Sequence, residues 1–408
     1  MTTTQPADTQ PRTPDVRPAE ADVPRRISTR GRFRPRAVTA EMVYALLGSA
    51  AGALGLTWVL YEAVLPFSGV LGFWLIWYAL FLGCYALVTA MTAGGGQAVA
   101  DRMVMVLVSS AAVVTAAIII NQIVYTTIKG WPALEHVGNF LTQTMELAGP
   151  LDPLTVGGIL HALVGSLEQM GIATVISVPL GVLAALFLAE IGGPTARVVR
   201  AVVEAMTALP EIIAGLFIYA MVILTFGLRQ SGFAAALALT VMMIPFVIRS
   251  AEVMLRLVPG GLREASLALG ASQWRTTWLV VLPTARSGLT TAVVLAMARA
   301  IGETAPVLIT AGFSQFLNAN PFSGPQTSLP LYIYSYEKLP QATEISRAFG
   351  AGLVLMIFVG ALFALARLLG RNPLAKQARR RIQMEARWQA AIERASARQA
   401  ERQRHAAK

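Results

Sequence analysis

Eight long apolar runs, separated by polar links, dominate this sequence. About 20 apolar residues in a helix span the hydrocarbon core of a bilayer, because each residue adds about 1.5 Å. Inside a bilayer, only helices and closed barrels pair every backbone N–H and C=O group. The runs therefore predict an all-α polytopic membrane protein with about eight transmembrane helices. The predicted spans are 42–61, 70–92, 103–128, 167–189, 206–227, 233–250, 288–311 and 349–369.

The composition excludes several other classes of protein. Hydrophobic residues make up 55% of the 408 residues and charged residues only 13%, which is unlike a soluble globular domain. The net charge of +11 comes from basic residues at the two ends of the chain, so it predicts no nucleic-acid partner. Cys84 is the only cysteine, and His136, His161 and His405 lie far apart, so neither a disulfide nor a metal site is predicted.

The positions of Arg and Lys in the links predict the orientation. Short cytoplasmic loops carry the excess of basic residues in membrane proteins. With both termini in the cytoplasm, the links place a large majority of their basic residues inside. The inside residues are Arg102, Arg197, Arg200, Arg249, Arg256, Arg263, Arg275 and Arg286, and the outside residues are Lys129, Arg229, Lys338 and Arg347. We therefore predict a multi-pass protein with both termini cytoplasmic.

A polar segment, 262–289, interrupts the apolar pattern on the predicted cytoplasmic face. It follows a cluster of helix breakers and begins with a short helix, in which Glu264 occupies the first turn, where the helix dipole favours an acid. Gly270 is predicted to end this helix. Small side chains leave the backbone open to close approach by a partner protein. They belong to Ala265, Ser266, Ala268, Gly270 and Ala271.

A second short helix is predicted in the same segment. Trp274, Trp278 and Val281 recur at the spacing that places all three on one helix face, suited to the bilayer or to neighbouring helices. Leu282-Pro283 is predicted to end this helix, because proline lacks the N–H that would continue it.

The seventh span carries two opposite charges. Arg299 is predicted to lie about 16 Å into its helix, near mid-bilayer, and Glu303 follows one turn later on the same face. Charged groups at that depth are costly and normally face an internal cavity. The pair either neutralises itself and ties helices together, or offers forked donors to an oxyanion in transit. Arg249 and Glu252, in the sixth span, either extend this path or anchor the helix at the membrane interface.

The polar segment resembles the cytoplasmic coupling motif of ATP-binding-cassette importer permeases, through Glu264-Ala265, Gly270 and Leu282-Pro283. The resemblance implies that this loop, 251–287, docks into a groove on a separate ATPase subunit, with Glu264, Ala265, Gly270 and Ala271 at the contact. A cytosolic connector with the same residues by chance is the alternative.

Three further segments resemble the phosphate-specific transporter permeases: Val178 to Glu190, Leu209 to Phe217 and Arg299 to Leu308. The GETAP run within the last segment, together with LPLYIY at Leu329 to Tyr334, resembles the A-type subunit more than the C-type subunit. The resemblance covers about residues 100–370, and it implies that six of the eight spans form a MetI-like permease core. Glu211 and Val253 depart from the usual family pattern.

The resemblance also implies the organisation of the whole chain. The predicted parts are a disordered cytoplasmic tail (1–40), an extra transmembrane hairpin (41–99), the permease domain (100–370) and a basic cytoplasmic tail (371–408) that is either solvated or in contact with anionic lipid. The implied setting is the bacterial plasma membrane. The implied partners are a C-type permease, a pair of ATPase subunits and an extracytoplasmic phosphate-binding protein.

The chain itself is predicted to be neither an ATPase nor another enzyme, and to hold no cofactor. None of its lysines, Lys129, Lys338, Lys376 and Lys408, follows a glycine as a Walker-type phosphate loop requires, so ATP would be bound by the partner. Two alternatives remain open. The cargo is another oxyanion, or the protein is an ion-coupled secondary transporter with helices broken at Pro179 and Pro245.

Overall fold

The structure, a computed structural model, describes residues 40–64, 69–92 and 95–369 together with Met384 and Trp388. Every regular element in these residues is a helix. Seven helices are long and apolar enough to cross a membrane, and a bent helix pair makes an eighth candidate. The prediction of an all-α multi-pass membrane protein is confirmed. The two predicted tails lie almost wholly outside the described residues.

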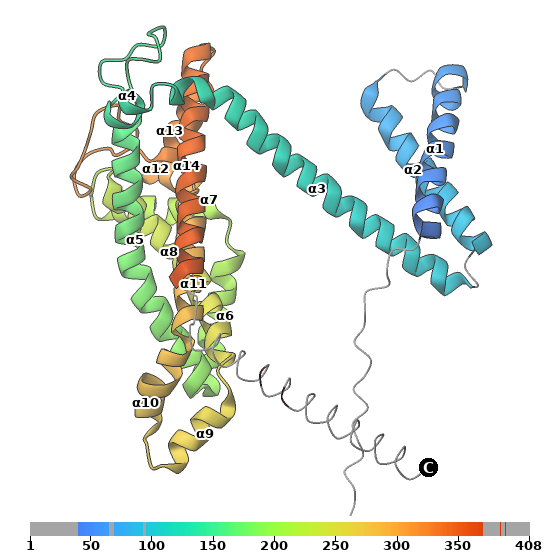
Figure 1. Ribbon diagram of the computed structural model, residues 1–408. Helices are drawn as coiled ribbons and strands as arrows, with labels where there is room; N and C mark the ends of the chain where they lie inside the picture. The colour runs from blue at the N-terminus through green and yellow to red at the C-terminus, as the bar shows by residue number, and fades with distance from the viewer. Residues whose placement is uncertain (1–39, 65–68, 93–94, 370–383, 385–387, 389–408) are drawn as a thin grey trace, which may run out of the picture. The chain divides into compact units, whose positions relative to one another are not determined.

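The chain forms two compact units, Met1–Ala117 and Ile118–Lys408, so the division falls within one long helix. The first unit is a helical hairpin followed by the start of that helix (Figure 1). Its elements are α1 (Ala40–Val59), η1 (Leu60–Val64), α2 (Val70–Thr92) and the first part of α3 (Gly96–Leu134). The indole N–H of Trp77 in α2 donates to the carbonyl of Ala50 in α1 at 3.2 Å, which joins the two arms.

The second unit packs its helices around α8. Its elements are the rest of α3, α4 (Val137–Thr142), α5 (Leu160–Leu186), η2 (Phe187–Ile191), α6 (Gly193–Ala208), α7 (Glu211–Ile218), η3 (Tyr219–Thr225), α8 (Gly232–Arg256), α9 (Gly260–Ala268), α10 (Gln273–Thr276), η4 (Thr277–Val281), α11 (Leu282–Ala300), α12 (Ala305–Thr310), α13 (Leu329–Tyr336) and α14 (Ala342–Leu369). Helix α8 contacts α5, α6, α7, α11 and α12. Within this unit, α9 and α10 lie at one end, and α4 lies at the other (Figure 1).

Small residues allow α8 to sit at this centre. Ala234, Ala235, Ala236 and Ala238 are all fully buried. At the crossing with α5, a Cβ atom on Gly181 would lie 2.6 Å from the side chain of Val247. Backbones in membrane bundles approach this closely only where side chains are small.

The fifth predicted span, 206–227, is not one continuous helix. The chain instead makes α6 and the α7–η3 helix, with an angle of 102° between them. Pro210 explains the break, since a proline disfavours helical dihedral angles at the residue before it. Leu209 is accordingly extended, with φ −69° and ψ 132°.

The seventh predicted span, 288–311, is also corrected. One helical run extends from Gln273 to Ala300, through α10, η4 and α11, so Leu282-Pro283 does not end a helix. Pro283 stands in the first turn of α11, directly after the π-helical turn η4, where its missing N–H does no harm. The run ends at Ala300, and Arg299 therefore lies in its last turn rather than near its middle.

A buried ion pair fastens the end of the second unit that lies opposite α9. Arg347 and Glu344 of α14 are each 1% exposed, and their side chains are joined at 2.9 Å. The Arg347 guanidinium also donates to the carbonyl oxygens of Asp152, Pro153 and Val156 at 3.0, 3.1 and 2.9 Å. One side chain thus holds the loop before α5 against α14.

Candidate functional site

Helix α9 is the short helix predicted in the polar segment. Pro259 precedes its first residue with extended backbone angles, φ −57° and ψ 133°. Gly270 follows its end with φ +84°, a left-handed conformation that glycine adopts without strain. The predicted stop at Gly270 is confirmed.

The surface of α9 is open in this single chain. All nine residues of α9 are described, and none of them is buried. Leu269, just beyond the helix, is 90% exposed. Among the described residues, no atom lies within 4 Å of a Cβ placed on Gly270. Of the predicted contact residues, Glu264 and Ala265 are exposed and Ala271 is half-buried, so the surface is free for another protein.

Arg263 attaches α9 to the helices beneath it. Its guanidinium forms an ion pair with Glu190 of η2 at 2.8 Å and donates to the carbonyl oxygens of Leu255 and Val258 at 2.9 and 2.7 Å. Neither Arg263 nor Glu190 was among the residues predicted for this site. They are 73 positions apart, and no spacing rule connects them.

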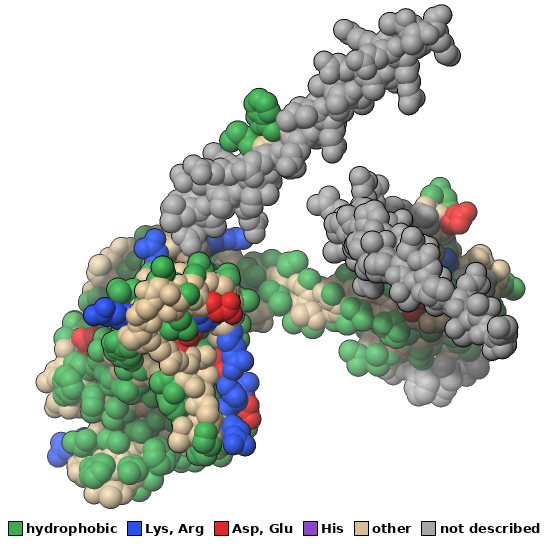
Figure 2. All heavy atoms as spheres, turned by 90° about the horizontal axis from the view of Figure 1, so that it is seen from below, with side chains coloured by type: hydrophobic (Ala, Val, Ile, Leu, Met, Phe, Trp, Pro, Cys, Tyr) green, Lys and Arg blue, Asp and Glu red, His purple; other side chains and the backbone are tan. Residues whose placement is uncertain are grey.

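Helix α10 completes the segment. Gln273 donates to the carbonyl oxygen of Glu190 at 2.7 Å. The rings of Trp274 and Trp278 lie 5.3 Å apart and are 69% and 38% exposed, whereas Val281 is fully buried. Val281 thus packs against neighbouring helices, which is one of the two surroundings predicted for this face, while the two tryptophans stay exposed. Figure 2, seen from this end of the second unit, shows basic and acidic side chains close together.

The predicted pair of Arg299 and Glu303 is present, and a second acid, Glu211, joins it. Arg299 pairs first with Glu211, at the start of α7, at 2.6 Å. Glu303 lies in the turn after α11, and its carboxylate is 3.7 Å from the Nε of Arg299. The Arg299 side chain is also 5.6 Å from the ring centre of Phe246 and remains 53% exposed.

Arg249 and Glu252 do not pair with each other. Arg249 lies 3.4 Å from Glu204 of α6, and Glu252 pairs with Arg200 of α6 at 2.8 Å and with Arg256 at 2.7 Å. Both residues thus tie α6 to α8.

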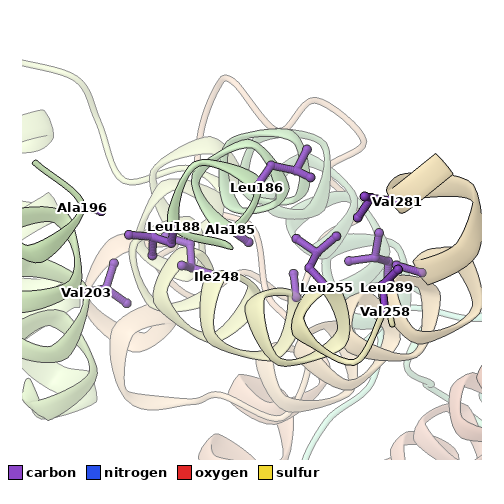
Figure 3. Packing of buried hydrophobic residues seen from close by; sticks show 12 residues of the cluster. Ala185, Leu186, Leu188, Ala196, Val203, Ile248, Leu255, Val258, Val281 and Leu289 are labelled. Carbon is purple, nitrogen blue, oxygen red and sulfur yellow. The ribbon is translucent and has the colours of Figure 1, made fainter. Parts of the chain in front are cut away.

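A hydrophobic cluster lies beneath α9 and joins the ends of these helices (Figure 3). It combines residues of α5, η2, α6, α8, η4 and α11. The members are Ala185, Leu186, Leu188, Ala196, Val203, Ile248, Ala251, Leu255, Val258, Val281, Ala285 and Leu289. Because these side chains are close-packed, the helix ends form one block.

The sequence is similar to those of known transport proteins. Residues 177–373 match the family described as the binding-protein-dependent transport system inner membrane component. The phosphate transport system permease protein PstA 1 of Mycobacterium tuberculosis is 44% identical over 232 residues, which are 57% of this chain and 75% of that protein. PstA of Haemophilus influenzae is 39% identical over 249 residues, or 60% and 85% of the two chains.

A solved structure of the MetNI methionine ABC transporter is also similar, with 24% identity, a TM-score of 0.41 and coverage of 52% of this chain and 94% of that one. The identities with the two PstA proteins extend over most of their lengths. On that ground, the chain belongs to the PstA family of phosphate transport system permease proteins.

Proposed function

We propose that this chain is the permease subunit of an ATP-driven importer that carries inorganic phosphate across the bacterial plasma membrane. Its membership of the PstA family and its multi-pass helical fold support this function over an ion-coupled secondary transporter. The observation that carries the proposal is α9, an exposed helix of mainly small residues fixed to the end of a bundle of membrane helices.

The complete importer has further subunits in this proposal. A pair of ATPase subunits binds and hydrolyses ATP, and one of them receives α9 in a groove through Glu264, Ala265, Gly270 and Ala271. A C-type permease and an extracytoplasmic phosphate-binding protein complete the complex. The chain itself holds no cofactor and catalyses no reaction. The extra hairpin, 41–99, and the two tails, 1–40 and 371–408, lie outside the proposed permease domain, 100–370.

Substitutions at Gly270 test the docking of α9. We expect Gly270→Trp to prevent the ATPase subunits from co-purifying with this chain, because the indole would occupy the surface that the groove covers. Gly270→Asn is the matched control, since asparagine tolerates a left-handed conformation and adds little bulk. Co-purification in mild detergent, with membrane abundance checked by immunoblot, measures the effect. Unchanged assembly of Gly270→Trp would contradict the docking role.

Labelling of introduced cysteines tests the proposed orientation. In a Cys84→Ala background, Ala268→Cys in α9 should react with a membrane-impermeant thiol reagent only after permeabilisation. Ser323→Cys, in the loop before α13, should react in intact cells. Both positions are exposed, and neither side chain is needed for a hydrogen bond found in the described residues. Labelling of Ala268→Cys in intact cells would contradict the proposed orientation.

The proposed route for phosphate passes Arg299. Phosphate near neutral pH carries a proton, so it accepts hydrogen bonds from a guanidinium and also donates one to a carboxylate. Arg299 with Glu211 and Glu303 provides both kinds of group within 4 Å of one another. Arg249 and Glu252, the other two residues predicted on this route, form separate ion pairs with Glu204 and Arg200 of α6.

A further inference from the structure

Helix α9 has few means of moving other helices. Its apolar residues Leu262 and Leu267 are exposed, so apolar packing does not fix it to the bundle. The hydroxyls of Ser266 and Thr276, 2.8 Å apart, link it to α10. A push on α9 can reach the membrane helices only through contacts that hold it to them, and Arg263 makes the most direct of these.

Arg263 uses all three of its nitrogen atoms at this contact. Nε and Nη2 both face the carboxylate of Glu190, with Nε 3.2 and 3.1 Å from its two oxygens and Nη2 2.8 Å from one of them. Nη1 donates to Val258, and Nη2 also donates to Leu255. The planar guanidinium is therefore fixed in orientation by partners from two directions, which a single ammonium group cannot reproduce.

Glu190 lies where α9 and α10 both contact the end of the α5–η2 helix. Its side chain is only 8% exposed, and it belongs to the last turn of the helix that α5 and η2 form together. Its carbonyl oxygen also receives Gln273 of α10, so both short helices converge on one residue. Gly192 and Gly193 follow, with φ +69° and +86°, and the chain turns there into α6.

Helices α6 and α7 connect Glu190 to the charged residues of the proposed phosphate route. Helix α6 shares the hydrophobic block of Figure 3 with α5, α8 and α11, and it is tied to α8 by two ion pairs. It continues into α7, whose first residue, Glu211, pairs with Arg299 of α11. A displacement of Glu190 is therefore a displacement of the helices that carry both residues.

We infer that Arg263 and Glu190 form the joint that transmits movement of α9 to the helices around Arg299. The two are positioning residues that touch neither ATP nor phosphate. The inference rests on the proposed function, because it requires that an ATPase subunit moves α9. A joint that served folding alone would stabilise the complex without affecting how hydrolysis and transport are linked.

The test uses the complete importer in proteoliposomes and measures phosphate transported per ATP hydrolysed. We expect Arg263→Gln and Glu190→Gln to assemble with the ATPase subunits and hydrolyse ATP, while this ratio falls at least about fivefold, the lower end of typical coupling between linked sites. The double variant should fall no further than either single variant, because both remove the same joint. Glu190→Gln keeps an acceptor oxygen for Arg263, which favours normal folding.

Arg256→Gln is the matched control. Arg256 is also an arginine at this end of α8 and also lies 2.7 Å from a carboxylate, but its partner, Glu252, is in the same helix. The amount of phosphate transported per ATP hydrolysed by the Arg256→Gln complex should equal that of the wild type. A wild-type ratio in assembled Arg263→Gln and Glu190→Gln complexes overturns the inference. Failure of both variants, and of Arg263→Lys, to reach the membrane also overturns it, since the contact would then be a folding anchor.

The Gly270→Trp variant separates this inference from the proposed function. If Gly270→Trp blocks assembly while the Arg263 and Glu190 variants keep the wild-type ratio, only the joint is wrong. If Gly270→Trp assembles and transports normally, α9 is not the docking element, and the proposed function fails at that step.

Discussion

Phosphate uptake by the Arg299→Gln variant is expected to be at least about tenfold slower than that of the wild type. This corresponds to an activation free energy about 1.4 kcal/mol higher. The reason is electrostatic. Arg299 is flanked by Glu211 at 2.6 Å and by Glu303 at 3.7 Å. Without its positive charge, the two carboxylates would face an approaching anion directly, and a neutral amide cannot offset them in a passage of low dielectric constant. Uptake of labelled phosphate, normalised to membrane abundance, measures the effect.

Arg299→Lys separates charge from geometry. If charge alone matters, this variant keeps most of the uptake. If the forked donors of the guanidinium are needed to hold one anion and two carboxylates at once, it loses most of it. The contacts with both acids favour the second outcome.

A triple variant tests whether the cluster is only structural. In Glu211→Leu/Arg299→Leu/Glu303→Leu, apolar residues replace the whole charge cluster, so no carboxylate is left unpaired. Arg299 and Glu211 are 53% and 41% exposed, and exposed ion pairs contribute little to stability. If this variant inserts at wild-type abundance and takes up phosphate normally, Arg299 has no part in the route.

The second large effect is expected at the opposite end of the second unit. Arg347→Leu should destabilise the protein by roughly 3–5 kcal/mol, because it leaves the carboxylate of Glu344 buried without its cation. It also removes the donor to the carbonyl oxygens of Asp152, Pro153 and Val156, which fixes the preceding loop. Thermal unfolding of the purified protein in detergent measures this loss.

Two further variants control this experiment. Arg229→Leu replaces an exposed arginine and should change the stability by no more than about 0.5 kcal/mol. Adding Glu344→Gln to Arg347→Leu removes the unpaired charge and should recover part of the loss. An Arg347→Leu protein as stable as Arg229→Leu would show that the ion pair contributes nothing.

The helical class, the approximate number of apolar spans and the position of α9 can all be predicted from the sequence. These properties are local. A run of apolar residues predicts a span wherever it occurs, and a glycine after a short helix ends that helix through its own backbone freedom. The motifs around Gly270 and Gly302, together with the segments Val178 to Glu190, Leu209 to Phe217 and Leu329 to Tyr334, also indicated the family that the comparisons then showed.

The pairing of charges on different helices depends on the packing of the helices and could not be predicted. Arg299 pairs first with Glu211, 88 positions away, and Arg263 pairs with Glu190, 73 positions away. Helical spacing predicts only partners that lie three or four residues apart. The sequence also predicted a helix end at Pro283. The helix continues there, because Pro283 stands in the first turn of α11, directly after the π-helical turn η4. Partners across helices depend on which faces meet, and packing of the whole bundle decides that.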